Sequence, residues 1–236
     1  MTNIGRIEIQ DLFVGSANAV GLYQGSVVIW EKSEPQWLCF TANTTNSTIR
    51  LDKAGFSGAD PISLETSTDG TTWTDYGWTD KTGDTLTMTN IGDKVYMRAK
   101  NENTTIGSGF ARYYTFVGTG SFAASGNIQS LLKADCSRTD APTYCYALLF
   151  NDCSSLTDAP ELPATTLADN CYNSMFNGCS NLSSITVGFS DWPASSSPTY
   201  NWVNGVAASG TFTCPSGLSD LRGANCIPTG WTKTDA

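Results

Sequence analysis

Three carboxylates and two aromatic rings lie close together in one short stretch of the chain: Asp75, Asp80 and Asp84 surround Tyr76 and Trp78. A glycoside hydrolase needs two carboxyl groups about 5–10 Å apart beside its bound sugar, and clustered carboxylates also bind calcium. Short acidic loops between strands are more often solvated turns. We therefore expect a chain that is not an enzyme and has no metal or other cofactor, with a capsule-degrading glycosidase as a lesser alternative.

Histidine is absent from the 236 residues. Ser-His-Asp and Cys-His nucleophile pairs, histidine zinc sites and imidazole proton transfer near neutral pH are therefore excluded. The chain has 13 Lys+Arg against 22 Asp+Glu, a formal net charge of −9. Because nucleic-acid binding depends on a basic surface that neutralises phosphates, we expect no nucleic-acid partner.

The aromatic side chains of the same stretch form a candidate glycan-contact site. Trp73, Tyr76 and Trp78 would stack on sugars if they lay exposed at the edge of a sheet. The alternative is that they pack in the core, where large aromatic side chains supply much of the buried area. The sequence leaves both interpretations open.

These side chains belong to a segment that alternates short β-branched and aromatic runs with turn signals. The pattern is typical of a β-sandwich, here residues 34–120. Within it, Asp69-Gly70 predicts a hairpin with a type I′ turn, which needs positive φ at its centre. The predicted strands cover residues 37–40, 48–51, 62–66, 85–88, 95–99 and 113–117.

The N-terminal segment repeats a strand-and-turn pattern at a spacing of ten residues. Residues 12–16 read Leu-Phe-Val-Gly-Ser and residues 22–26 read Leu-Tyr-Gln-Gly-Ser. The pattern predicts an antiparallel β-hairpin meander over residues 4–32. Because so small a meander is unstable alone, residues 1–33 either pack on the neighbouring domain or anchor the chain in an assembly. The candidate anchor residues are Leu12, Phe13, Leu22, Tyr23, Ile29 and Trp30.

The third segment, residues 121–236, contains an internal repeat. Residues 145–156 recur 26 residues later at 171–182, with seven of twelve positions identical. The apolar spacing predicts a short helix in each coil, and the proline-containing connector that follows predicts an extended rung. Stacked coils of this kind bury a continuous core. The repeat-core residues are Cys145, Phe150, Cys153, Leu156, Cys171, Phe176, Cys179 and Leu182.

This spacing also accounts for the cysteines. Cys145 and Cys171 occupy equivalent repeat positions, as do Cys153 and Cys179. Buried free cysteine packs as a small hydrophobe, so we expect reduced core thiols. A disulfide is the alternative, with Cys214 and Cys226 as the best candidates, and the absence of any Cys-x-x-Cys argues against zinc.

The repeat resembles the BspA-type leucine-rich repeats, whose pattern is Leu-x-x-Ile-x-Leu-Pro followed by an Ala-Phe-x-x-Cys-x-x-Leu helix. The resemblance covers about residues 125–190 and departs from the pattern in having Ala159 in place of Ile. It implies a short α+β repeat domain that needs caps. A helical start at residues 127–132 and a segment at 201–215 are candidate caps. The matching residues are Leu156, Ala159, Leu162, Pro163, Phe176, Cys179 and Leu182.

The three-part order resembles head- and tail-fibre proteins on the surface of phages that infect Bacteroidales, including the crAss-like phages. The resemblance implies a mainly β, multidomain homotrimer whose residues 1–33 bind capsid or tail proteins. The outer domains would adhere to a cell-surface glycan or protein of a host or mucosal surface.

The remaining expectations concern location. Residues 1–6 lack the charged start and apolar run of a secretory signal, and no apolar stretch is long enough for a membrane span. We therefore expect no membrane insertion and a virion protein assembled in the host cytoplasm. The alternative is an exported bacterial surface adhesin with BspA-like repeats.

Overall fold

The computed structural model describes residues 22–24, 27–30, 36–55, 62–195 and 197–236. The chain divides into two compact units, Met1–Glu34 and Pro35–Ala236. The described residues are mainly β and form several antiparallel sheets, which confirms the predicted class. No α-helix occurs among them, and none of their helical segments has the length and apolar character needed to cross a membrane.

The described residues of the first unit form a β-hairpin. Strand β1 (Leu22–Gln24) pairs antiparallel with β2 (Val27–Trp30), with Tyr23 opposite Val28. Four predicted anchor residues therefore lie on these two strands. The other two, Leu12 and Phe13, lie outside the described residues, as does the first part of the predicted meander.

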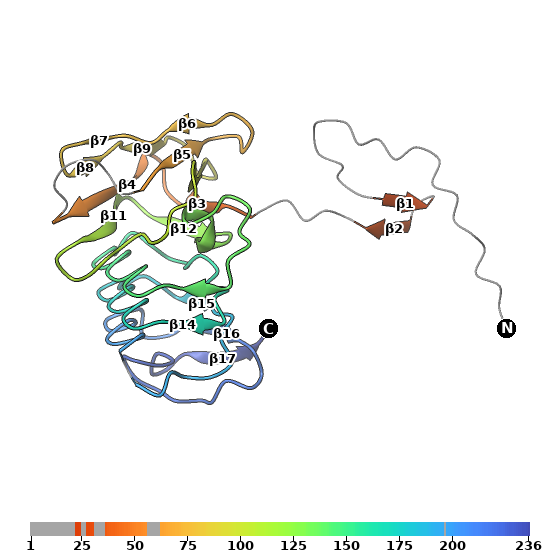
Figure 1. Cartoon of the computed structure of the whole chain (residues 1–236), viewed down its shortest axis with the longest axis vertical. Helices are drawn as coiled ribbons and strands as arrows, with labels where there is room; N and C mark the ends of the chain where they lie inside the picture. The colour runs from red at the N-terminus through yellow and green to blue at the C-terminus, as the bar shows by residue number, and fades with distance from the viewer. Residues whose placement is uncertain (1–21, 25–26, 31–35, 56–61, 196) are drawn as a thin grey trace. The chain divides into compact units, whose positions relative to one another are not determined.

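The second unit begins with two antiparallel sheets, which we call the two-sheet part (residues 36–125; Figure 1). The five-stranded sheet has the order β12-β3-β10-β5-β6, and the three-stranded sheet has the order β11-β4-β9. The two sheets pack against each other, since the rings of Phe40 and Phe116 are 5.0 Å apart. All six predicted strand runs are confirmed. The bounds are β3 Leu38–Ala42, β4 Ser47–Ala54, β5 Leu64–Ser67, β6 Thr74–Asp75, β9 Leu86–Met88, β10 Lys94–Ala99, β11 Tyr113–Thr119 and β12 Phe122–Ser125, with a further hairpin of β7 Trp78–Thr79 and β8 Thr82–Gly83.

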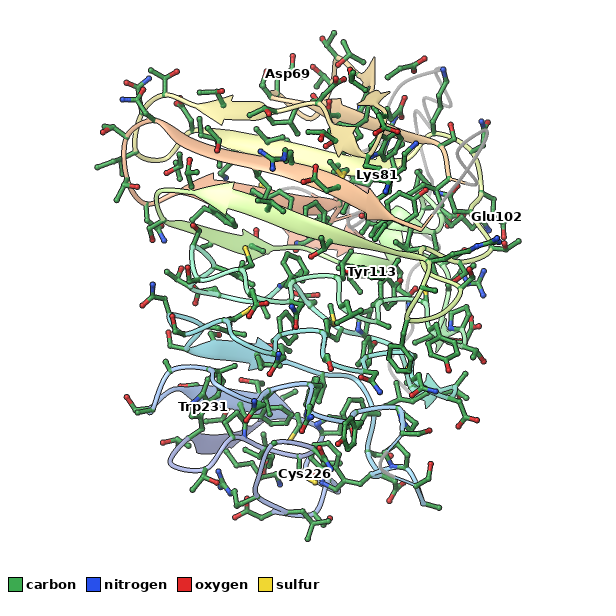
Figure 2. All side chains as sticks on the ribbon, turned by 90° about the vertical axis from the view of Figure 1, so that its left-hand side faces the viewer. Asp69, Lys81, Glu102, Tyr113, Cys226 and Trp231 are labelled. Atoms are coloured by element: carbon green, nitrogen blue, oxygen red, sulfur yellow. The ribbon has the colours of Figure 1, made fainter. Side chains whose placement is uncertain are left out.

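The turn between β5 and β6 contains the Asp69-Gly70 pair, but it is not the predicted type I′ turn. Gly70 has a φ of +72°, whereas Asp69 is not among the residues of positive φ. The Asp69 carboxylate instead accepts hydrogen bonds of 2.7 Å from the backbone N–H groups of Thr72 and Thr71. These bonds lower the pKa of Asp69 and hold a longer loop. Figure 2 places Asp69 at the end of the second unit opposite Cys226.

Below the two-sheet part the chain winds into a stack of coils, which we call the coil stack (residues 128–236; Figure 1). Its extended rungs pair in parallel, and β15 (Ser184–Thr186), β16 (Thr211–Cys214) and β17 (Thr232–Asp235) form one sheet. Strands β13 (Asp140–Ala141) and β14 (Thr166–Leu167) form a second parallel pair. The extended rungs predicted from the proline-containing connector are thus present.

The short helices predicted for each coil are wrong. Residues 143–152 and 169–178 form successive β-turns, in which alternate N–H groups bond within the coil and the others bond the next coil. The N–H of Ala147 donates to the Tyr144 carbonyl, and the N–H of Tyr146 donates to the Cys171 carbonyl at 2.9 Å.

In this turn ribbon every fourth residue has a left-handed backbone conformation, with positive φ. Asn, Asp, Ser and Gly tolerate or favour such turns more than they favour helix interiors, and the two repeats are rich in them. The residues of positive φ in the turn ribbon of the three coils are Tyr144, Leu148, Asp152, Asn170, Ser174, Gly178, Asn201 and Gly205. Apolar spacing of three and four residues fits this ribbon as well as it fits a helix.

Equivalent side chains of successive coils stack on one another. The rings of Tyr146 and Tyr172 are 5.8 Å apart, and those of Phe150 and Phe176 are 5.6 Å apart, both near parallel. The predicted repeat core is buried throughout, with no member more than 4% exposed. On the outside of the ribbon, Asn177 donates a hydrogen bond of 3.0 Å to Asn151, one coil away.

The coil stack extends beyond the two repeats seen in the sequence. The segment predicted as a C-terminal cap forms a third coil, in which Trp202 packs on Phe176, and β17 adds another rung. The predicted helical start at residues 127–132 is present as the 3-10 helix η1 (Ile128–Leu131), capped by the side chain of Asn127.

The two-sheet part and the coil stack share hydrogen bonds and one core. The N–H groups of Phe122 and Ala124 in β12 donate to the carbonyls of Ser155 and Asp158, so the five-stranded sheet continues into the rungs. The N–H of Phe116 in β11, on the other sheet, donates to the carbonyl of Leu149 in the coil stack. The predicted boundary at residue 120 therefore falls inside one compact body.

Phe150 lies at the centre of this junction. Its ring stacks on Phe116 at 4.9 Å and on Phe176 at 5.6 Å, and Phe40 lies 6.4 Å away. We predict that Phe150→Ala lowers the free energy of unfolding of the second unit by about 3–5 kcal/mol, the usual cost of such a cavity. Urea unfolding followed by circular dichroism measures this change.

The matched control removes an exposed apolar side chain. Ile91 is 67% exposed, so Ile91→Ala should change stability by no more than about 0.5 kcal/mol. Equal effects of the two substitutions would contradict the assignment of Phe150 to the centre of the core.

Candidate functional site

The three aromatic residues predicted to contact glycans do not form one platform. Tyr76 and Trp78 pack together, with their rings 5.0 Å apart at nearly a right angle. Trp73 instead packs on Trp37, also edge to face at 5.0 Å. The structure therefore separates the predicted set into two groups.

The first group is attached to the core of the two-sheet part. Tyr76 is only 5% exposed, and its hydroxyl accepts a hydrogen bond of 2.7 Å from the N–H of Leu51. Burial raises the pKa of this phenol. The indole of Trp78 donates to the Leu51 carbonyl at 2.9 Å and remains half-buried. Tyr76 thus acts as a support, and Trp78 keeps part of its surface accessible.

The second group is a cation–π cluster. The guanidinium of Arg98 lies 3.7 Å from the ring centroid of Trp73 and 4.8 Å from that of Trp37. Arg98 is also paired with Glu65 at 2.6 Å. Because Arg98 contacts the face of Trp73 that a sugar would stack on, this cluster is better explained as packing than as binding.

An open pocket of about 240 Å³ lies beside Tyr76 and Trp78. Asp75 and Lys100 form an ion pair of 2.7 Å at this pocket, and their side chains are 72% and 44% exposed. The lining residues are Ile62, Ser63, Leu64, Asp75, Tyr76, Gly77, Trp78 and Lys100. An aromatic wall, a carboxylate and an ammonium group together suit a small polyhydroxylated ring. The pocket volume is below the roughly 300 Å³ of the smallest drug-sized sites, so only a small ligand would fit.

Strand pairing brings this pocket together. Ala99 of β10 lies opposite Leu64 of β5, and the N–H of Lys100 donates to the carbonyl of Ser63. Asp75, Tyr76 and Trp78 were predicted from the sequence, whereas Ser63 and Lys100 were not. No local signal joins Lys100 to Asp75, because only the sheet register places them side by side.

The three carboxylates of the glycosidase hypothesis have different local surroundings. Asp75 ends β6 and binds Lys100. Asp84 follows β8 and accepts a hydrogen bond of 2.8 Å from the N–H of Gly77, while Asp80 has a left-handed φ of 55° between β7 and β8. Asp75 and Asp84 are thus engaged in structural contacts, and the glycosidase stays a hypothesis.

All eight cysteines are free thiols, including Cys214 and Cys226. Burial raises the pKa of Cys145 and of Cys153 to about 12, which keeps these thiols protonated at neutral pH and poor nucleophiles. The arrangement matches a packing role for the repeat cysteines. Within the described ranges, no group of three or more Cys, Asp or Glu side chains is arranged to hold a metal ion.

In comparisons with known proteins, no protein-family model, no curated protein and no solved structure matches the chain.

Measurements of sugar binding test the role of this pocket. We predict that Asp75→Ala and Lys100→Ala each weaken binding of neutral hexoses by about tenfold, because each removes hydrogen bonds to the bound sugar. Saturation-transfer difference NMR with glucose, galactose and mannose measures this. The fold should be unchanged, because an exposed ion pair contributes only about 0–1 kcal/mol.

The chain offers a matched control in the exposed ion pair between Lys133 and Asp135, 3.2 Å apart. Lys133→Ala should leave hexose binding unchanged. If it weakened binding as much as Lys100→Ala, or if the wild-type chain bound no hexose, the pocket assignment would be refuted.

Proposed function

We propose that this protein is a non-enzymatic display module on the surface of a virion, a head or tail fibre or decoration protein. Residues 1–33 attach it to a capsid or tail protein, and the rest of the chain presents an adhesive surface to a cell-surface glycan or protein. The observation that carries the proposal is the division of the chain into a small N-terminal unit and one compact body.

The continuity of that body supports a display role. A single sheet runs from β6 through β12 into the rungs of the coil stack, so the pocket and the coils are held in a fixed relation. A rigid body loses little conformational entropy when it binds. Several copies on one particle would convert weak sugar contacts into strong attachment.

We interpret the finer layout as three segments along the chain: residues 1–33, a β-sandwich at 34–120, and a BspA-like leucine-rich-repeat segment at 121–236 that shares one compact body with the sandwich. The 26-residue period of the stacked coils supports the third segment. The turns that replace the helices are its main departure from the BspA pattern. We further propose a homotrimer, assembled in the host cytoplasm, with no nucleic-acid or membrane contact.

Removing residues 1–33 tests the attachment. We predict that the shortened chain is lost from purified particles while its far-UV circular dichroism and thermal unfolding resemble those of the second unit in the full chain. The physical reason is that the second unit has its own core. Immunoblots of purified particles measure retention.

A substitution within the hairpin of β1 and β2 tests the same attachment more specifically. Val28→Pro removes a backbone donor from β2 without shortening the chain, and it should also release the protein. Particles that retain both altered chains at the wild-type level would refute the proposed role of residues 1–33.

A further inference from the structure

The outer face of the parallel sheet in the coil stack carries hydroxyl groups in register. Strands β15, β16 and β17 each begin with two Ser or Thr residues that are separated by one residue of another type. Because side chains alternate across a strand, the two hydroxyls of each strand lie on one face. Ile185 and Phe212 between them point inward and are at most 1% exposed.

The pairing aligns these hydroxyls into two columns. Ser184 lies opposite Thr211, which lies opposite Thr232, and the second column consists of Thr186, Thr213 and Thr234. All six side chains are half-buried or exposed. Neighbouring strands are about 4.8 Å apart, and alternate residues of one strand are about 6.6 Å apart. We call this set of six residues the hydroxyl array; Figure 1 shows its three strands stacked.

Most of the hydroxyl array is unsatisfied by the protein. Thr213 and Thr234 share a hydrogen bond of 2.9 Å. The side chains of Ser184, Thr186, Thr211 and Thr232 make no hydrogen bond to any residue that the structure describes. Some other hydroxyls of the second unit do pair with each other, as Thr48 does with Thr119 at 2.7 Å.

One charged residue continues the hydroxyl array: Asp158 pairs with Ser184 at the end of the first column and accepts a hydrogen bond of 2.8 Å from the Thr157 hydroxyl. Lys233 and Asp235, 3.8 Å apart, alternate with Thr232 and Thr234 and so lie on the opposite face of β17. Neither column contains a basic residue, so a polyanion would gain no ion pair in the array, and a polycation would find a single carboxylate. Hydroxyl groups both donate and accept hydrogen bonds, so the complementary partner is neutral, flat and itself rich in hydroxyls.

We propose that the hydroxyl array binds an extended neutral polysaccharide, lying across the three strands. The proposal deepens the display function by naming a second glycan contact, and it rests on that function only for its biological setting. Each contact is a hydrogen bond between a threonine or serine hydroxyl and a sugar hydroxyl, repeated along the columns.

The test is retention of the full chain on microcrystalline cellulose, a regular neutral glucan. The variant Thr186→Val/Thr211→Val/Thr232→Val removes three hydroxyls that make no hydrogen bond to the described protein, while keeping the shape and strand preference of the side chains. We expect wild-type retention and a loss of about tenfold or more in affinity for the triple variant, since three hydrogen bonds are removed.

The control is Thr48→Val/Thr119→Val, which removes hydroxyls that already bond each other and should bind as the wild type does. The proposal is overturned if the wild type does not bind, if the triple variant binds equally, or if the control loses binding as well. It is also overturned if the chain prefers sulfated dextran to cellulose, or if the triple variant differs only in self-association by sedimentation.

Because cellulose retention uses purified protein, its failure would leave particle attachment through residues 1–33 untouched. Conversely, a chain that binds cellulose but is absent from particles would leave the hydroxyl array standing and refute the virion proposal. The two proposals can therefore fail separately.

Discussion

The packing of Phe150 against Phe116 and Phe176 is the interaction on which the rest of the second unit depends. Two antiparallel sheets have an open end, and a stack of coils has an open first coil. Each exposes unpaired backbone groups and apolar side chains that must be covered. Here the two ends cover each other. Strand β12 supplies the backbone hydrogen bonds on one face, and the aromatic column through Phe150 supplies the apolar contact on the other.

This junction also gives the buried cysteines their role. A coil of about 26 residues has room for few large side chains in its core, so small apolar groups fill the spaces between the aromatic columns. Cys179 lies against the carbonyl of Phe150, at 2.9 Å, and its thiol is kept protonated by burial, which raises its pKa. Cysteine therefore serves here through size and polarizability and not through its reactivity.

The sequence predicted the strands and the period of this protein well, and the coil geometry and the pocket poorly. Alternating side chains and turn residues are local signals, which is why all six strand runs were found. The turns of residues 143–152 were mistaken for helix because the apolar spacing is the same and the deciding hydrogen bonds reach the next coil.

The separation of Trp73 from Trp78, and the pairing of Lys100 with Asp75, depend on sheet register, which no local pattern reveals. The hydroxyl array likewise appears only when Thr211 and Thr232 are aligned by pairing.

Native-state hydrogen exchange at the junction tests the central claim that the second unit is one cooperative body. The amides of Phe116, Phe122 and Ala124 all donate across the junction. The structure predicts that they exchange with the same opening free energy as Phe176 deep in the coil stack and as the β3 and β10 amides of the two-sheet part. Junction amides that open at a clearly lower free energy than both parts would show two separate domains and contradict this description.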